Sequence, residues 1–215
     1  MFLHYNSSAN EANELAERLN AIRAGSAMCL QADLASNDGA ARLAGDLRQH
    51  TDHLELLVNN ASRFYPTPVE AVSQDTWDDL FDSNLRGPFF LCQSLLPELR
   101  EASGSIVNII DIHAERPMRS HALYCMTKAG LAMMTRSLAR ELGPEIRVNG
   151  VSPGAILWPE DEPTDRVKDH ILGRTALKRM GDPQDIADAV IYLGLDAPYV
   201  TGQILAVDGG RSLNV

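Results

Sequence analysis

The sequence predicts an α/β protein in which helices cover both faces of a doubly wound parallel sheet. Short β-rich runs alternate with long amphipathic stretches along the chain, an order typical of parallel strands joined by right-handed helical crossovers. The runs 54–59 and 105–111 are nearly continuous in apolar residues, as strands covered on both faces are. The 215 residues show no internal repeat or linker, which indicates a single domain over 1–215.

Strands and helices are expected in regular alternation. The β-rich runs predict strands over 2–5, 27–31, 54–59, 105–111, 146–151 and 203–207. The amphipathic stretches predict helices over 8–24, 36–49, 73–100, 120–142 and 183–195. Ser8 and Glu11 have the spacing of a capping box at one helix start, Asp182-Pro183 starts another helix, and Gly143-Pro144 ends a third.

Composition narrows the class of protein. Apolar residues make up 45% and the formal charge is −10, which argues against disorder and disfavours nucleic acid and anionic membranes as partners. No apolar run approaches the roughly 20 residues of a membrane span, and the N-terminus lacks the basic lead of a secretory signal. Cys29, Cys92 and Cys125 are widely spaced, which favours reduced thiols over disulfides or a metal site. We therefore expect a cytoplasmic protein.

Polar turns follow three of the predicted strands. They are Asn59-Asn60-Ala61-Ser62, Asp111 and Pro153-Gly154. In open parallel sheets, ligands bind beyond the carboxyl ends of the strands, where the strand order reverses. We therefore take these turns as candidate site segments, although Asn, Asp, Pro and Gly also populate ordinary turns.

Tyr124 and Lys128 lie four residues apart in a helical pattern, so both side chains project from one face. An ammonium near a phenol stabilises the phenolate and is expected to lower the pKa of Tyr124, which makes a proton donor usable near neutral pH. Asp111 ends the preceding strand and can bring a carboxylate to the same place. The alternative is an exposed amphipathic pair, because this spacing also occurs by chance.

A series of motifs connects these features in chain order: 59–61, Asn84, Asp111, Tyr124 with Lys128, 147–154 and 207–210. The series resembles the short-chain dehydrogenase/reductase superfamily over nearly the whole chain. The resemblance implies a Rossmann-like fold and hydride transfer with a nicotinamide dinucleotide. It also implies that Tyr124 is the acid/base, that Lys128 lowers its pKa and holds the nicotinamide ribose, and that Asn84 supports a proton-relay water.

The same resemblance implies a cofactor site. NADPH is the expected cofactor, with its 2′-phosphate near His4 and Ser8. NADH stays open, because Ser7 stands where the relatives usually carry a basic residue. The residues implied in cofactor binding are His4, Asn6, Ser7, Ser8, Asp33, Leu34, Asn60, Ala61, Ser62, Tyr124, Lys128, Pro153 and Gly154.

Asp111 stands thirteen residues before Tyr124, where most of the superfamily has serine. An ionised carboxylate repels the charge that builds up on a carbonyl oxygen, but a carboxyl group can relay a proton to a ring nitrogen. With the stretches 60–68 and 111–117, this substitution resembles the pteridine reductase subgroup. The resemblance implies that Phe64 stacks on the pterin, and that Phe64, Asp111 and Tyr124 contact the substrate.

The glycine-rich loop of the superfamily is absent from the sequence. The resemblance places that loop on a first strand and helix, with the strand between 2–5 and 54–59, so the sequence looks truncated at its N-terminus. Two apolar strand edges are then expected to face a gap or to pair directly. A start placed too late and a real short form with weakened dinucleotide binding both stay open.

We therefore expect an NADPH-dependent reductase of a dihydropterin or dihydrofolate. The resemblance implies a homotetramer built on the long helices that contain Asn84 and Tyr124, and the apolar run Leu131-Ala132-Met133-Met134 is consistent with it. A carbonyl reductase of the same fold and a non-catalytic dinucleotide-binding or scaffold protein are the alternatives. The acidic stretch 160–165 is expected either to be a solvated loop or to tune the substrate choice.

Overall fold

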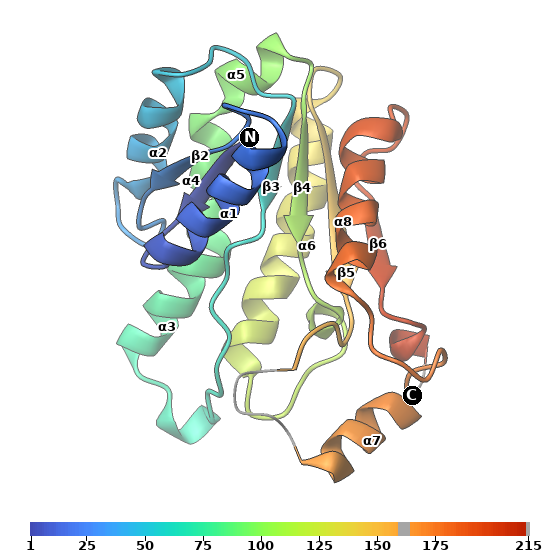
Figure 1. Ribbon diagram of the computed structural model, residues 1–215. Coiled ribbons are helices and arrows are strands. Elements are labelled where there is room, and N and C mark those ends of the chain that lie inside the picture. Colours follow the sequence, from blue (N-terminus) through green and yellow to red (C-terminus); the bar gives the residue numbers. More distant parts are fainter. Residues whose placement is uncertain (159–163, 214–215) are drawn as a thin grey trace.

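A four-stranded parallel sheet, in the order β3-β4-β5-β6, forms the centre of the fold, and β1 and β2 pair in a separate parallel sheet (Figure 1). The computed structural model describes residues 1–158 and 164–213. The strands are β1 (Phe2–Tyr5), β2 (Met28–Gln31), β3 (Leu56–Asn59), β4 (Ser105–Ile109), β5 (Arg147–Pro153) and β6 (Ile204–Val207). The α-helices are α1 (Ala9–Ile22), α2 (Gly39–Arg48), α3 (Gln74–Phe81), α4 (Gly87–Ser94), α5 (Leu96–Glu101), α6 (Ala122–Leu142), α7 (Asp165–Gly173) and α8 (Pro183–Ile191).

Helices cover both faces of the larger sheet, as the sequence predicts. Ile106 and Val148 point to the face where buried residues of α2, α4 and α6 form the main core. Val107 and Val151 point to the opposite face and pack with Ala189 of α8. This division follows from the alternation of side chains along a strand, and Figure 1 shows α6 and α8 on opposite sides of β4 and β5.

The single helix predicted over 73–100 is wrong. The chain instead forms α3, a π-helical turn over Asp82–Arg86, α4 and α5. Pro88 and Pro97 lie in the first turns of α4 and α5. Because proline has no N–H to donate to the carbonyl of the preceding turn, each of them interrupts a continuous helix.

The smaller sheet stands apart from the larger one. β1 pairs with β2 from Phe2 to Tyr5, and no pairing joins β1 to β3 in the part of the chain that the structure describes. β3 is therefore an edge strand, and Val58 is 38% exposed. The prediction that both apolar strands are covered on both faces is right for β4, where Ser105 to Asn108 are buried, and wrong for β3.

The two helix starts that were predicted from capping residues have different outcomes. Asp182 and Asp185 form a reciprocal capping box at the start of α8. The capping box predicted at Ser8 and Glu11 is wrong, because the Ser8 side chain makes no capping hydrogen bond. No helix within residues 1–158 and 164–213 is long and apolar enough to cross a membrane. The stretch predicted to tune substrate choice lies, over 160–163, outside the described residues.

Candidate active site

The carboxyl end of the β3-β4-β5-β6 sheet brings the candidate catalytic side chains together. Asp111 follows β4 in extended backbone conformation (φ −176°). Tyr124 and Lys128 lie in the first half of α6, whose residues pack along β5. Both side chains point inward: Tyr124 is 5% exposed and Lys128 is 2% exposed. The exposed amphipathic pair is therefore excluded.

The Asp111 carboxylate is held at both of its oxygens. The Tyr124 hydroxyl donates to Oδ2 at 2.8 Å, and the backbone N–H of His113 donates to Oδ1 at 2.8 Å. The second contact is the capping bond of the short helical turn Ile112–Ala114. The backbone next to Asp111 thus fixes its carboxylate in the orientation that accepts the hydrogen bond from the Tyr124 hydroxyl.

The expected lowering of the Tyr124 pKa by Lys128 is wrong for this arrangement. Burial raises the pKa of Tyr124 above its ordinary value, and the adjacent Asp111 carboxylate raises it further. The Lys128 Nζ lies 5.7 Å from the centroid of the Tyr124 ring and donates to the carbonyl of Ile109 at 2.9 Å. Burial and the carboxylate bonded to the hydroxyl therefore outweigh the ammonium beside the ring.

Burial also changes the proton affinity of the lysine. It lowers the pKa of Lys128 to about 8, although the charge of Asp111 acts in the opposite direction. A neutral phenol and an ammonium that titrates near pH 8 form the ionisable centre of the site. A phenol with a raised pKa is a weak proton donor on its own, so proton transfer would depend on the nearby ammonium to stabilise the conjugate base.

Asn84 lies in the π-helical turn and is 1% exposed. Its Oδ1 accepts from the backbone N–H of Arg63 at 2.7 Å, and its Nδ2 donates to the Arg63 carbonyl at 2.9 Å and to Thr127 Oγ1 at 3.2 Å. The side chain thus joins the loop after β3 to α6, one residue before Lys128. Its predicted role in a proton relay stays a prediction.

Phe64 lies directly against Tyr124, the candidate acid/base. Its ring meets the Tyr124 ring edge to face, with centroids 4.8 Å apart, and stacks on the His121 ring at 4.8 Å with an interplanar angle of 15°. Phe64 is 48% exposed, so this aromatic group can meet a planar ligand. His121 is not among the predicted site residues, because its contact with Phe64 depends on how the loop after β3 packs on α6.

The residues implied in cofactor binding fall into two groups. Asn60, Ala61 and Ser62 are exposed on the loop after β3, near Phe64. Pro153 ends β5, and Gly154 follows it against the turn at Asp208. A Cβ at Gly154 would lie 2.7 Å from the Cα of Asp208, so glycine allows this close approach. Both segments lie at the carboxyl end of the larger sheet, where Asp111 also follows β4.

The second group lies around the β1-β2 sheet. The His4 Nε2 lies 2.8 Å from the carbonyl of Ala32, and Asp33 Oδ1 accepts from the backbone N–H of Ala35 at 3.0 Å. Leu34 is buried, and the backbone carbonyl of Asn6 accepts from Gln31 at 3.0 Å. Ser7 and Ser8 are exposed before α1. Phosphate binding here stays a prediction.

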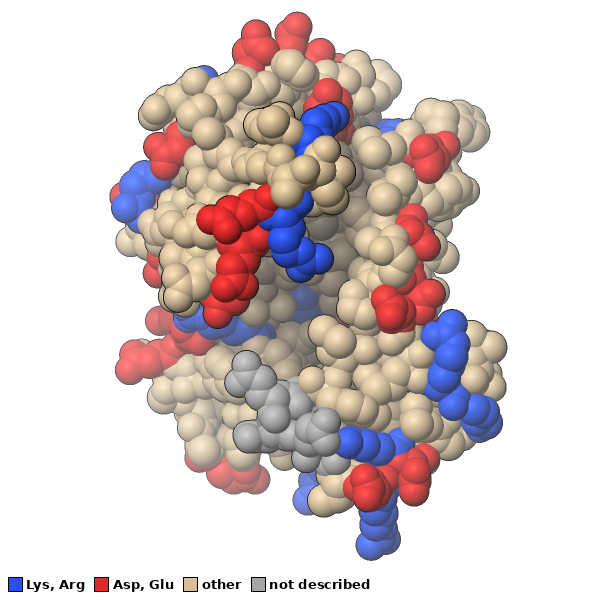
Figure 2. Space-filling model, in the orientation of Figure 1, with Lys and Arg blue, Asp and Glu red and all other residues tan. Residues whose placement is uncertain are grey.

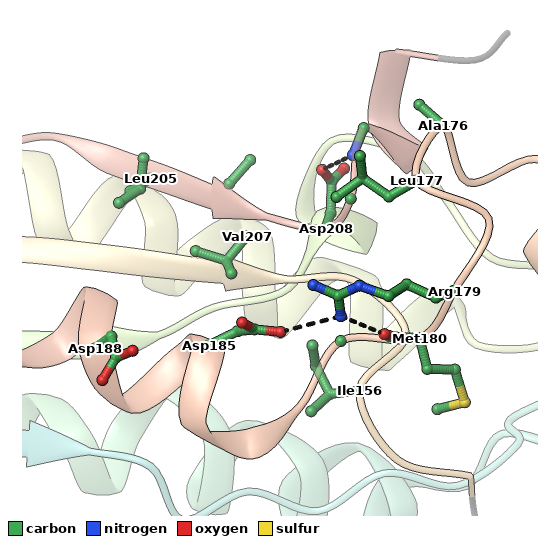
Figure 3. Close-up of a pocket in the computed structure, with 14 residues that line it drawn as sticks. Ile156, Ala176, Leu177, Arg179, Met180, Asp185, Asp188, Leu205, Val207 and Asp208 are labelled. Carbon is green, nitrogen blue, oxygen red and sulfur yellow. Dashed lines mark hydrogen bonds and ion pairs between the residues drawn. The ribbon is translucent and has the colours of Figure 1, made fainter.

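A separate cavity of about 550 Å³ lies between β6 and α8 (Figure 3). Arg179 crosses it and binds the carbonyl of Met180 at 2.8 Å and the carboxylate of Asp185 at 3.5 Å. No predicted catalytic or cofactor-binding residue lines it. Asp111 instead borders a smaller hollow of about 80 Å³ beside Ser152. On the face drawn in Figure 2, basic side chains lie in separate small groups.

Comparisons with known proteins give matches over nearly the whole chain. Residues 1–212 match the family described as enoyl-(acyl carrier protein) reductase. The chain is 35% identical to pteridine reductase 1 of Leishmania tarentolae over 98% of this chain and 87% of that protein. It is 34% identical to a 3-oxoacyl-(acyl-carrier-protein) reductase of Staphylococcus epidermidis, over 97% of this chain and 86% of that protein.

A solved structure shows the same fold. It is described as a blue fluorescent protein from a metagenomic library in complex with NADPH, and it superposes with a TM-score of 0.87 at 33% identity, covering 98% of this chain and 86% of that one. The order of the motifs, the α/β fold and these matches agree. The chain belongs to the short-chain dehydrogenase/reductase superfamily and is an oxidoreductase of that class.

Proposed function

We propose that the protein is an NADPH-dependent reductase of a dihydropterin or dihydrofolate, acting in the cytoplasm. The observation behind this proposal is the hydrogen bond of 2.8 Å between the Tyr124 hydroxyl and the Asp111 carboxylate. A carboxylate bonded to the proton donor would repel the charge that builds up on a ketone oxygen. It can instead accept hydrogen bonds from an amino-substituted heterocycle.

The residues at the catalytic end fit the nicotinamide end of NADPH. Lys128 is 2% exposed and uses one N–H group on the Ile109 carbonyl; an ammonium has three donors. The other N–H groups of Lys128 suit the hydroxyls of a ribose beside Tyr124. Asn60 and Gly154 follow β3 and β5 at the carboxyl end of the same sheet. We assign the adenine end to Asp33 and the 2′-phosphate to His4, Ser7 and Ser8.

The protein residues supply the proton and its environment. NADPH, when bound, supplies the hydride to a ring carbon of the substrate. Tyr124 then gives its hydroxyl proton to the neighbouring ring nitrogen, which hydride addition has made more basic. The Lys128 ammonium stabilises the phenolate that remains, and solvent returns the proton. Burial and the charge of Asp111 keep the phenol protonated until then, because both raise the pKa of Tyr124.

Phe64 supplies the surface for the planar ring. Its position 4.8 Å from the Tyr124 ring and its 48% exposure support stacking beside the proton donor. Aromatic rings prefer offset or edge contacts at such centroid separations. The substrate would therefore lie against Phe64 with its reacting nitrogen toward Tyr124.

A carbonyl reductase is the same-fold rival, favoured by the 34% identity to the 3-oxoacyl-(acyl-carrier-protein) reductase. The test is the kcat/KM of the purified chain with NADPH for a 7,8-dihydropterin and for a 3-oxoacyl thioester. The proposal expects the dihydropterin to be preferred by at least about 100-fold, which is well within the roughly 10⁴-fold that a site built to hydrogen-bond its substrate can provide. A preference for the thioester would overturn it.

A non-catalytic dinucleotide-binding or scaffold protein is the rival from another class, because the sequence has no glycine-rich loop. Titration of the chain with NADPH and NADH separates the two. The proposal expects saturable binding that is tighter for NADPH. If neither cofactor bound at roughly millimolar concentration, a free energy of about −4 kcal/mol, the scaffold reading would replace the enzyme.

We also propose that the protein is a homotetramer. Exposed apolar side chains support this: Phe89 and Phe90 of α4 are 40% and 43% exposed, and Met126 and Met133 of α6 are 47% and 59% exposed. Leu131 is buried within the subunit instead. Sedimentation velocity should give a tetramer, and Phe90→Glu with Met133→Glu should dissociate it. A monomeric wild-type protein would contradict the proposal.

A further inference from the structure

The loop after β3 is bound to helix α3 through one carboxylate. Asp79 Oδ1 accepts from the Arg63 guanidinium, and its Oδ2 accepts from the Tyr65 hydroxyl at 2.6 Å. Arg63 and Tyr65 are the residues on either side of Phe64. A single side chain on a helix therefore restrains the loop immediately before and immediately after the exposed aromatic ring.

Two buried contacts hold the backbone of the same loop. Asn84 binds both the N–H and the carbonyl of Arg63, and the Thr67 N–H donates to the Ser120 carbonyl at 2.5 Å. Asn84 and Thr67 are 1% and 3% exposed. These contacts set the path of the chain, whereas the Asp79 contacts act on the two side chains that flank Phe64.

The restrained ring contacts the proton donor. Phe64 meets Tyr124 and His121 at centroid separations of 4.8 Å. We propose that Asp79 is a positioning residue that holds Phe64 against Tyr124 and so sets the affinity for the planar substrate. The identity of that substrate rests on the proposed function, whereas the restraint of the loop does not.

The exposure of the Arg63–Asp79 ion pair predicts that its loss will change substrate affinity more than stability. The Arg63 and Asp79 side chains are 37% and 32% exposed, and pairs at this exposure contribute little to stability. Loss of Asp79 should therefore leave the protein folded. A loop that must be ordered at binding lowers affinity instead, so the Michaelis constant should change more than turnover.

Asp79→Asn in the full chain tests the proposal, with Asp78→Asn as the matched control on the exposed side of the same helix. We expect the KM for a 7,8-dihydropterin to rise about tenfold, with kcat and the NADPH dissociation constant within about twofold. Asp79→Glu, which keeps the carboxylate, should restore most of the affinity. Tyr65→Phe, which removes one of the two donors, should give an intermediate KM.

Hydrogen exchange by mass spectrometry over 60–68 gives a second measurement that needs no substrate. We expect faster exchange in Asp79→Asn and unchanged exchange in Asp78→Asn. Unchanged exchange in Asp79→Asn, or a fall in kcat with KM constant, would overturn the positioning role. If the wild-type protein reduced no dihydropterin, the proposed function would fail, and the exchange measurement would still decide whether Asp79 restrains the loop.

Discussion

The central strands of the larger sheet are more deeply buried than the first strand of the smaller sheet. In the larger sheet, Ser105 to Asn108 of β4 and Val148 to Ser152 of β5 are buried. In the smaller sheet, every residue of β1 is partly exposed, and α1 buries only Ala16. The groups proposed for proton transfer belong to the first region, and most of those proposed for the cofactor's adenine end belong to the second.

This difference in burial separates the groups proposed for proton transfer from those proposed to bind the adenine end of the cofactor. Asp111, Tyr124 and Lys128 depend on precise mutual geometry, and the buried strands and α6 provide a rigid support for it. The β1-β2 unit joins the main core through a few residues, Leu30 and Ala32 among them. We expect this unit to open more easily than the catalytic half and to become ordered when a dinucleotide binds.

The largest expected effect is in the rigid half. Tyr124→Phe removes the proposed proton donor and keeps the ring that contacts Phe64. We expect turnover of a dihydropterin to fall on the order of 10³-fold, the scale of a lost general acid, with the NADPH dissociation constant changed by less than about threefold. Steady-state kinetics with a cofactor titration measures both. Retention of wild-type turnover would mean that the proton comes from elsewhere.

The pH dependence of kcat/KM tests the role proposed for the Lys128 ammonium. Burial lowers the pKa of Lys128 to about 8, so the ammonium is present below that pH and is lost above it. We expect kcat/KM to fall roughly tenfold per pH unit above about 8. A profile that stays flat to about pH 10 would contradict the assigned role of the ammonium.

The same shift has a consequence for stability. Above pH 8 the folded protein binds fewer protons at Lys128 than the unfolded chain does, because the unfolded amine keeps its ordinary pKa of 10.5. The contribution of Lys128 to stability therefore rises as the pH increases from about 8 toward 10.5. In Lys128→Met this increment should disappear, which denaturant unfolding at several pH values would reveal.

The smallest expected effect compares the two regions directly. Backbone amides of β1 and β2 should exchange with solvent about tenfold faster than those of β4, because fewer buried contacts hold them. Saturating NADPH should slow exchange in β1 and β2 and leave β4 unchanged. Equal protection of both sheets without cofactor would remove the basis for the comparison.

Local pattern predicted the parts of the fold that depend on local chemistry. The alternation of strands with helices, the helix start at Asp182-Pro183 and the shared face of Tyr124 and Lys128 follow from spacing alone. Pro88 and Pro97 also indicate that the stretch 73–100 is not one continuous helix. The helical periodicity of the stretch nevertheless favoured a single helix. Helix α7 was not predicted.

Features set by three-dimensional proximity could not be predicted. The raised pKa of Tyr124 depends on how deeply the hydroxyl is buried and on which charge is bonded to it. The contact of Asp79 with Arg63 and Tyr65 joins residues 16 and 14 positions apart, across elements whose packing the sequence does not specify. His121 stacks on Phe64 for the same reason.

The most direct test of the central claim is the substrate preference of Asp111→Ser compared with that of the wild-type protein, measured as kcat/KM with NADPH for a 7,8-dihydropterin and a 3-oxoacyl thioester. Our account predicts that the variant loses dihydropterin reduction by at least about 100-fold, because the carboxyl that accepts the Tyr124 hydroxyl at 2.8 Å is gone, and that thioester reduction does not fall. Undiminished dihydropterin reduction by Asp111→Ser would contradict it.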